Sequence, residues 1–220
     1  MAERLPYSTK AFRFARAILN TSISSYRIAR GACRGRTIQH WEELVGLVHL
    51  LRQLRPTAVM EIGIAEGGML ALWAQIVPSN AHLIGLDIKI LNGVDGLVRS
   101  RLRTGQKLSL IEADSHADST KQKVLDVLGG GKLDFLFIDG DHSYEGVKLD
   151  FENFSSLVRP GGLVGFHDII PDYSVRFGAQ TNCYAGGVYK FWSQVISRFP
   201  HYEFIESVGQ DGFGIGVVRM

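Results

Sequence analysis

Short apolar runs alternate with stretches of helical periodicity through most of the chain. The run at 133–138 is apolar at every position except Asp134, and Asp139 follows it directly. Runs of this kind are typical of parallel strands that helices cover on both faces. By this pattern we predict strands at 58–62, 82–86, 107–112, 133–138 and 163–166.

Apolar residues at helical spacing separate these strands and precede the first of them. Leu44, Leu47, Val48 and Leu51 share one face of such a segment, and Pro56 ends it. We predict helices at 8–30, 39–54, 69–76, 121–128, 144–158 and 187–199.

The end of the chain has a different pattern. A turn is predicted at 160–162, and after the last helix two strands at 202–207 and 212–218 flank a Gly-rich stretch. That spacing predicts an antiparallel hairpin. A dehydrogenase domain would normally continue with a sixth parallel strand, whereas a closing hairpin resembles the seven-stranded methyltransferase sheet. We therefore predict an α/β fold with a doubly wound, Rossmann-like, seven-stranded sheet. It is mostly parallel with a C-terminal antiparallel hairpin, and helices lie on both faces.

Composition fits one domain of this kind. The chain has 220 residues, 45% of them hydrophobic, and a net charge of +2, which argues against a polyanion-binding role for the whole molecule. No apolar run reaches the roughly 18 to 20 residues that span a bilayer. Cys33 and Cys183 lie far apart and form no CxxC motif. We expect a cytoplasmic protein without a membrane span.

Charge is concentrated at the start of the chain. Residues 1–36 contain eight basic residues and a single acid: Arg4, Lys10, Arg13, Arg16, Arg27, Arg30, Arg34 and Arg36 against Glu3. We interpret 1–55 as a helical segment that caps the active site or pairs with a second subunit, and 56–220 as the cofactor-binding domain. A solvated basic face is the simpler alternative. Nucleic-acid contact is not expected, because aromatic residues are not interleaved with the basic ones.

A glycine-rich turn follows the first strand. Gly63, Ala65, Gly67 and Gly68 form a GxAxGG pattern rather than the GxGxxG of dinucleotide-binding domains. Glycine allows a tight turn and close approach of a ligand, and the next helix offers free N–H groups. We predict that all four residues bind a cofactor, with a purely structural turn as the alternative.

Acidic residues also follow the second and third strands. Asp87 could accept hydrogen bonds from both hydroxyls of a ribose, and Asp114 or Ser115 could meet an adenine amino group. Each of them could instead cap a helix. These features together still permit NAD as the cofactor.

The most specific stretch of the chain follows the fourth strand. Asp139, Asp141 and His142 come directly after it, and His167 with Asp168 follow the fifth. Carboxyl ends of neighbouring parallel strands meet at one edge, so Asp139, His167 and Asp168 should converge. Carboxylates and an imidazole together suit a divalent cation, and His142 could accept a proton. Turn and cap chemistry is the structural alternative.

The residues 59–68, 137–148 and 157–168 resemble class I S-adenosylmethionine-dependent methyltransferases. The likeness is to the cephalosporin-hydroxylase-like or macrocin-O-methyltransferase-like branch, which is related to the metal-dependent catechol and caffeoyl-CoA O-methyltransferases. It covers about residues 57–220.

This resemblance implies roles for individual residues. Glu61, Gly63 and Gly67 would contact the methionine end of the cofactor, Asp87 the ribose, and Asp114 with Ser115 the adenine. Asp139 matches the first metal aspartate of the catechol-type enzymes, and His142 falls where those enzymes place a catalytic lysine. His167 and Asp168 fall where they carry an Asp-Asn metal pair. The histidine is a departure that leaves open which metal would bind, Mg²⁺ or a similar ion.

From these residues we predict an S-adenosylmethionine-dependent methyltransferase. It would methylate a hydroxyl of a small molecule, a sugar or a phenol, with Asp139, His167 and Asp168 holding a divalent metal and with Asp139 and His142 catalytic. Asp139 would also bind the cofactor, whose methyl group would lie near Gly63 and Asp139. The long stretch 171–187 would be a substrate lid. Three alternatives stay open: a metal-free enzyme with a histidine base, an NAD-linked oxidoreductase, and a non-catalytic cofactor-binding protein.

Overall fold

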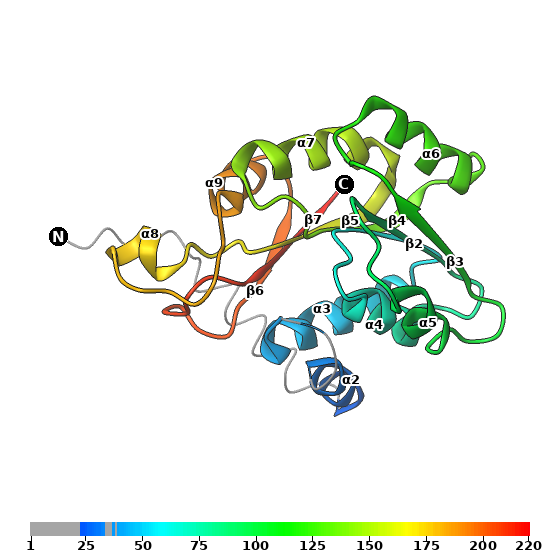
Figure 1. The fold of residues 1–220 in the computed structure, drawn as a ribbon. Helices are drawn as coiled ribbons and strands as arrows, with labels where there is room; N and C mark the ends of the chain where they lie inside the picture. Colours follow the sequence, from blue (N-terminus) through cyan, green and yellow to red (C-terminus); the bar gives the residue numbers. More distant parts are fainter. Residues whose placement is uncertain (1–22, 34–36, 38) are drawn as a thin grey trace.

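The computed structural model describes residues 23–33, 37 and 39–220, and Figure 1 shows their arrangement. In this part of the chain one sheet of seven strands runs in the order β3-β2-β1-β4-β5-β7-β6. The strands are β1 Ala58–Ile62, β2 His82–Asp87, β3 Lys107–Glu112, β4 Leu133–Ile138, β5 Val158–His167, β6 His201–Phe204 and β7 Ile215–Arg219. The first five are parallel, and β7 pairs antiparallel with both β5 and β6, which confirms the predicted fold.

Helices cover both faces of the sheet (Figure 1). On one face lie α2 Ile23–Cys33, α3 Trp41–Leu54, α4 Gly68–Ile76 and α5 Val94–Arg99; on the other lie α6 Asp118–Leu128, α7 Tyr144–Phe154 and α9 Val188–Val195. Short α8, Tyr173–Phe177, stands beyond the end of β5. Alternate strand residues divide between the two faces: Phe135 and Phe137 of β4 pack with the first set, Leu136 and Ile138 with the second. This burial on both faces explains why β4 is almost continuously apolar.

The chain order places a crevice at the centre of the sheet. After β1 the chain moves outward to β2 and β3, then returns to β4 on the other side of β1. The connections after β1 and β4 therefore run to opposite sides. In open α/β sheets ligands bind at such a switch point, beyond the carboxyl ends of the strands. The candidate site residues Asp87, Asp139 and His167 lie at or directly after the carboxyl ends of β2, β4 and β5.

Several predicted boundaries were wrong. The helix predicted at 144–158 ends at Phe154, and a 3₁₀ turn, Ser155–Leu157, leads into β5. Pro160 disfavours helical backbone at Arg159, and Arg159 donates a hydrogen bond to Asp134 on the neighbouring strand. The predicted turn at 160–162 is consequently an irregularity within β5, where the register with β4 shifts.

Other differences are smaller. The helix predicted at 187–199 stops at Val195, since Pro200 disfavours helical backbone at the residue before it. The hairpin strands, His201–Phe204 and Ile215–Arg219, are shorter than predicted, and the longer loop 205–214 connects them. For 88–106 no helix was assigned, yet α5 lies there, and α8 lies within the predicted lid. Residues 8–22 of the first predicted helix fall outside the described residues. No helix among the described residues combines the length and the apolar character needed to cross a membrane.

Candidate active site

The turn between β1 and α4 fits tightly against the end of β4. Gly63 has a φ of +80°, and a Cβ built on it would lie 2.1 Å from the carbonyl oxygen of Asp139. Its amide donates to the carbonyl of Leu86 at 2.9 Å. A side chain at this position would be strained by its backbone conformation and would collide with main chain. Gly63 thus lets β1, β2 and β4 end close together.

Asp87 braces this turn. Its Oδ2 accepts hydrogen bonds from the amides of Ile64 at 2.8 Å and Ala65 at 3.1 Å, and its Oδ1 accepts from Lys89 at 3.0 Å. Ala65 has a φ of +42°, which these bonds help to hold. Asp87 therefore shapes the glycine turn besides facing the cavity predicted to take a ribose.

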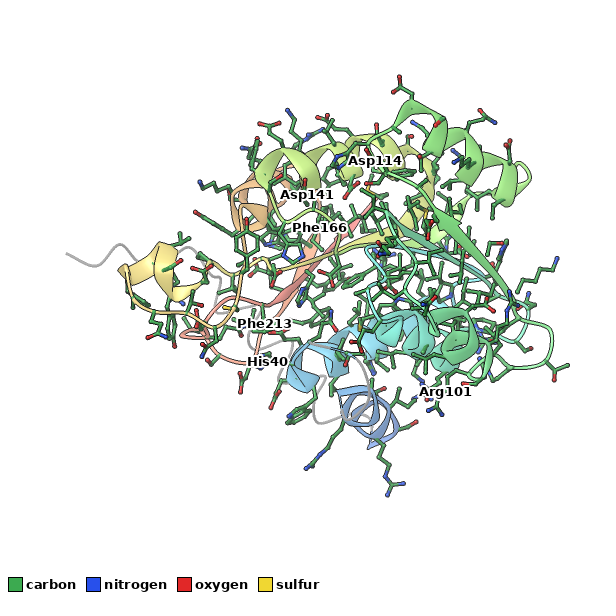
Figure 2. The ribbon with its side chains drawn as sticks, viewed as in Figure 1. His40, Arg101, Asp114, Asp141, Phe166 and Phe213 are labelled. Carbon is green, nitrogen blue, oxygen red and sulfur yellow. The ribbon has the colours of Figure 1, made fainter. Side chains whose placement is uncertain are left out.

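A cavity of about 710 Å³ opens at the carboxyl edge of the sheet. The predicted cofactor residues in its wall are Gly63, Ala65, Asp87, Asp114, Ser115 and Asp139. Asp141 and His142 line it too, and Figure 2 shows Asp114 and Asp141 on its α7 side. The Oδ1 of Asp114 accepts from the amide of His116 at 2.9 Å, so it also stabilises the local turn.

A second cavity of about 300 Å³ adjoins the first through Gly63, Ala65 and Asp139. Glu61, which the resemblance places at the methionine end of a cofactor, lines it together with Gly68. Gly67 lines neither cavity. A Cβ there would lie 2.9 Å from Val94 Cγ1, so this glycine serves the packing of α4 against α5.

Glu61 is almost completely buried. Its Oε2 accepts a hydrogen bond of 2.6 Å from the indole N–H of Trp73 on α4. Burial, together with the negative charge of Asp139, raises the pKa of Glu61 well above its ordinary value. Burial therefore favours the neutral form of this carboxyl group.

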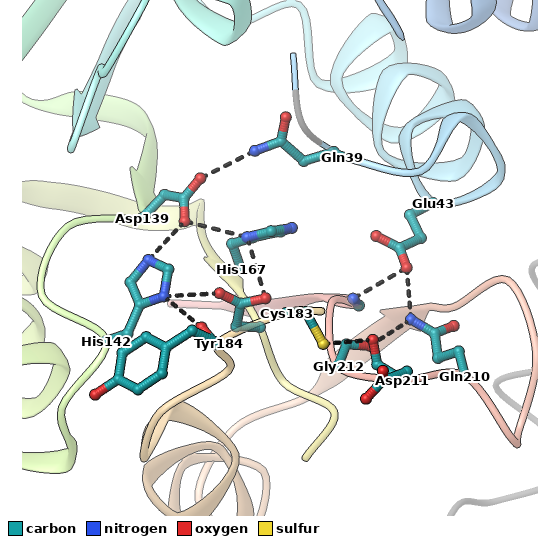
Figure 3. Close-up of polar contacts among 12 residues, drawn as sticks. Gln39, Glu43, Asp139, His142, His167, Cys183, Tyr184, Gln210, Asp211 and Gly212 are labelled. Carbon is teal, nitrogen blue, oxygen red and sulfur yellow. Dashed lines mark hydrogen bonds and ion pairs between the residues drawn. The ribbon is translucent and has the colours of Figure 1, made fainter. Parts of the chain in front are cut away.

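Two carboxylates and two imidazoles converge beyond β4 and β5 (Figure 3). His142 Nδ1 lies 2.9 Å from Asp168 Oδ2, and His142 Nε2 lies 3.4 Å from Asp139 Oδ1. His167 Nδ1 lies 3.1 Å from Asp139 Oδ1 and 3.5 Å from Asp168 Oδ1. Asp168 has a φ of +60°, a conformation that Asp tolerates better than most residues and that turns its carboxylate toward His142. The predicted convergence of Asp139, His167 and Asp168 is confirmed, and His142 joins them.

The charges in this cluster are strongly coupled. Hydrogen bonds to Asp139 and Asp168 raise the pKa of His142 to about 10. Burial would lower the pKa of His167, but the two carboxylates outweigh it and raise that pKa well above its ordinary value. Burial would raise the pKa of Asp139 and of Asp168, and the imidazolium charges outweigh it and lower both. With these partners alone, His142 holds its proton at neutral pH, and the two carboxylates favour the charged form of His167.

This donor set fits a divalent cation. One ligand atom from each of Asp139, His142 and Asp168 lies within 4.8 Å of the others. The carboxylate oxygens suit Mg²⁺ or Mn²⁺, whereas the imidazole nitrogens favour first-row transition-metal ions. His167 reaches the same two carboxylates through Nδ1. The geometry groups His142 as well as His167 with the predicted metal aspartates.

Asp141 belongs to a different group. Its Oδ1 accepts a hydrogen bond of 2.8 Å from the amide of Ser143, and this bond lowers its pKa. Asp141 thus performs the turn chemistry that was the alternative for this stretch.

The predicted lid contacts His142. The carbonyl of Tyr184 lies 3.0 Å from His142 Nδ1, and the Tyr184 ring stacks on the imidazole with centroids 6.2 Å apart. The Tyr184 side chain itself is largely exposed.

Sequence reasoning missed two polar residues near the start of α3. Gln39 Nε2 donates to Asp139 Oδ2 at 3.0 Å. Glu43, fully buried, accepts hydrogen bonds at Oε1 from Gln210 Nε2 and from the amide of Gly214. Neither residue lies in a recognisable motif, although a charged residue on the apolar face of the 39–54 helix was a visible irregularity.

Comparison with known proteins bears on this site. A family model described as a methyltransferase domain matches residues 60–169. An uncharacterized protein of Acanthamoeba polyphaga mimivirus is 32% identical over 137 residues, covering 54% of this chain and 58% of that protein. Caffeoyl-CoA O-methyltransferase 2 of Zea mays is 29% identical over 128 residues, covering 57% of this chain and 47% of the maize protein.

Solved structures share the fold. MycE methyltransferase from the mycinamycin biosynthetic pathway, in complex with Mg, SAH and mycinamycin VI, superimposes with a TM-score of 0.59 at 20% identity. The match covers 90% of this chain and 55% of MycE. The chain thus spans about half the length of the proteins it resembles here.

Proposed function

The chain belongs to the methyltransferase-domain family, and from this premise we propose that it transfers a methyl group from S-adenosylmethionine to a hydroxyl of a small molecule, assisted by a divalent cation. A GxAxGG turn and an antiparallel strand β7 beside β5 both favour this over an NAD-linked oxidoreductase.

One observation carries the proposal: Asp139 belongs to both halves of the site. It lines the two adjoining cavities, and its carboxylate contacts His142 and His167. We call Asp139, His142, His167 and Asp168 the acid–histidine cluster. A cofactor in the cavities and an acceptor at this cluster would consequently meet at the Asp139 side chain. Such juxtaposition of donor and acceptor is the main requirement of a transfer reaction.

The walls of the cavities suit the parts of the cofactor. Asp87 would face the ribose, Asp114 and Ser115 the adenine, and Glu61 the methionine end. When bound, S-adenosylmethionine supplies an electrophilic methyl group, and the cation lowers the pKa of the acceptor hydroxyl. A positively charged methionine end beside Glu61 would also favour the ionised form of that carboxyl group.

His142 is the group proposed to take the acceptor's proton. With Asp139 and Asp168 as its partners it already holds a proton at neutral pH. Asp139 and Asp168 would hold the cation, and His142, no longer paired with their charges, would then be able to accept a proton. A cation at this edge is thus compatible with a histidine base. Without a cation, the ion pairs with Asp139 and Asp168 keep His142 protonated and oppose its action as a base.

The acceptor class follows from similarity and position. The similar proteins include one named for caffeoyl-CoA and one whose structure contains mycinamycin VI. We infer a sugar or phenol hydroxyl as acceptor, covered by the segment 171–187, whose Tyr184 stacks on His142. Residues 1–55 would complete the cap, since Gln39 reaches Asp139. Pairing of this segment with a second subunit is a further proposal that light scattering can test.

The test compares Asp139→Ala with Asp141→Ala, using a panel of sugar and phenol acceptors with labelled S-adenosylmethionine. Both residues line the larger cavity, but only Asp139 belongs to the acid–histidine cluster. We expect Asp139→Ala to abolish turnover and Asp141→Ala to retain most of it. EDTA should stop the wild-type enzyme, and Mg²⁺ should restore it. Full activity of Asp139→Ala would refute the metal role, and EDTA-resistant turnover would favour the histidine-only mechanism.

A further inference from the structure

Glu43 is a buried carboxyl group that the proposed mechanism does not use. It lies on α3, on the opposite side of His167 from Asp139, and its side chain is inaccessible to solvent. Its Oε1 accepts from Gln210 Nε2 at 2.7 Å and from the amide of Gly214 at 3.0 Å. These bonds tie α3 to the loop 205–214 and hold the carboxyl group in one orientation.

The second oxygen of Glu43 faces His167. In Figure 3 this oxygen points toward the imidazole edge that carries Nε2, away from Asp139. Both Glu43 Oε2 and His167 Nε2 are buried, and neither has a hydrogen-bond partner among the described residues. The two groups interact electrostatically: burial raises the pKa of Glu43 to about 7, and the His167 charge opposes that rise.

Two buried polar atoms of opposite character, facing each other, are costly unless something joins them. An unsatisfied buried donor or acceptor has lost its hydration without gaining a partner, which destabilises the folded state. The two atoms form no hydrogen bond with each other, so a water between them is the partner that would satisfy both. His167 Nδ1 already faces Asp139 and Asp168, so Nε2–H is the donor left for this contact.

We propose that Glu43 is a positioning residue for His167. One buried water would accept a hydrogen bond from His167 Nε2–H and donate one to Glu43 Oε2. This inference rests on the proposed function only for the role of the His167 imidazole as a ligand of the divalent cation. Held from its Nε2 side, the ring presents Nδ1 to the Asp139–Asp168 edge, where a divalent cation would bind. Carboxylates that hold the far nitrogen of a metal-binding histidine fix both its orientation and its tautomer.

The experiment reads the His167 side chain directly. Long-range ¹H–¹⁵N spectra of the full chain, recorded without cation or cofactor, should show a slowly exchanging, downfield Nε2 proton on His167. Glu43→Gln keeps an oxygen for Gln210 and Gly214 but presents an amide to the water, so this proton should exchange faster and move upfield. Titration with Mn²⁺ should then show about ten- to a hundredfold weaker binding to Glu43→Gln than to wild type.

Glu203→Gln is the matched control. Glu203 is also a buried carboxylate, but its Oε1 accepts from Trp192 Nε1 on the side of β6. It should leave both the His167 signal and Mn²⁺ affinity unchanged. An unchanged His167 signal in Glu43→Gln overturns the inference. If that variant does not fold, the wild-type spectrum decides, and the absence of a protected His167 Nε2 proton there overturns the inference as well. Wild type that shows the proton but binds no Mn²⁺ would instead contradict the cation part of the proposed function.

Discussion

Replacement of Gly63 by alanine tests whether the close approach of β1 and β4 builds the site. The new Cβ would lie 2.1 Å from the Asp139 carbonyl oxygen and 2.5 Å from its carbonyl carbon. Both atoms belong to the main chain, so no side-chain rotation can relieve the overlap. Either the turn moves away from β4 or the Asp139 peptide moves toward solvent.

The expected cost has two parts. A positive φ of +80° in a residue with a Cβ costs about 1–2 kcal/mol. Relief of the overlap costs about 1–3 kcal/mol more, as for other overpacked sites. A total of about 2–5 kcal/mol corresponds to a melting temperature lowered by roughly 5–15 °C in a chain of this size.

Gly130→Ala separates the two parts. Gly130 has a φ of +85°, and nothing lies within 4 Å of the Cβ position. This variant should therefore show only the backbone cost of about 1–2 kcal/mol. The assay is differential scanning fluorimetry of both variants, followed by calorimetric titration with S-adenosylhomocysteine.

Gly63→Ala should melt well below Gly130→Ala and should bind S-adenosylhomocysteine at least tenfold more weakly than wild type. Equal melting temperatures for the two variants would show that the overlap is absorbed without cost. Undiminished ligand affinity in Gly63→Ala would refute the role of this contact in shaping the cavity.

Two further predictions concern buried or partly buried aspartates. Asp87→Asn should weaken S-adenosylhomocysteine binding about tenfold or more and lower folding stability by about 1–3 kcal/mol, because Asp87 Oδ2 accepts hydrogen bonds from two amides of the turn. The exposed Asp95→Asn is the control, and equal affinities of the two variants for S-adenosylhomocysteine would contradict the prediction. Burial alone would raise the pKa of Asp134, but hydrogen bonds from Arg159, Thr57 and Ala58 outweigh it and lower that pKa. The contribution of Asp134 to folding stability is therefore present above the unfolded-state pKa of about 3.9 and is lost as pH falls through the lower folded-state pKa. Denaturant unfolding between pH 7 and 3 should accordingly show wild type losing its advantage over Asp134→Asn in acid, and a constant difference would contradict this account.

The fold was largely predictable because its strongest signals are local. The run at 133–138 had to be buried on both faces, and strand bounds at 58–62, 107–112 and 133–138 match the structure. Boundaries failed where a tertiary contact decided them. Arg159 binding to Asp134 draws residues 158–162 into β5, and no sequence period reports that contact.

The site divided in a similar way. Strand-end residues such as Asp139, His167 and Asp168 were predictable, because parallel strands bring their carboxyl ends to one edge. Gln39 and Glu43 were not, since they lie more than 95 positions before the residues they face, and the way α3 packs on the sheet is not encoded in a local motif. The role of Asp87 in bracing the turn was hidden for the same reason, because its partners are backbone amides.

The position of β7 has a consequence for how this protein matures on the ribosome. β7 lies between β5 and β6, and its Ile215 pairs with His167, the last residue of β5. Until residues 215–219 have emerged, the strand that ends in His167 and leads into Asp168 has an open edge. An exposed strand edge invites wrong pairing. The acid–histidine cluster should therefore be among the last parts of the nascent chain to reach native order, and stalled chains ending before residue 215 should be prone to aggregate through β5.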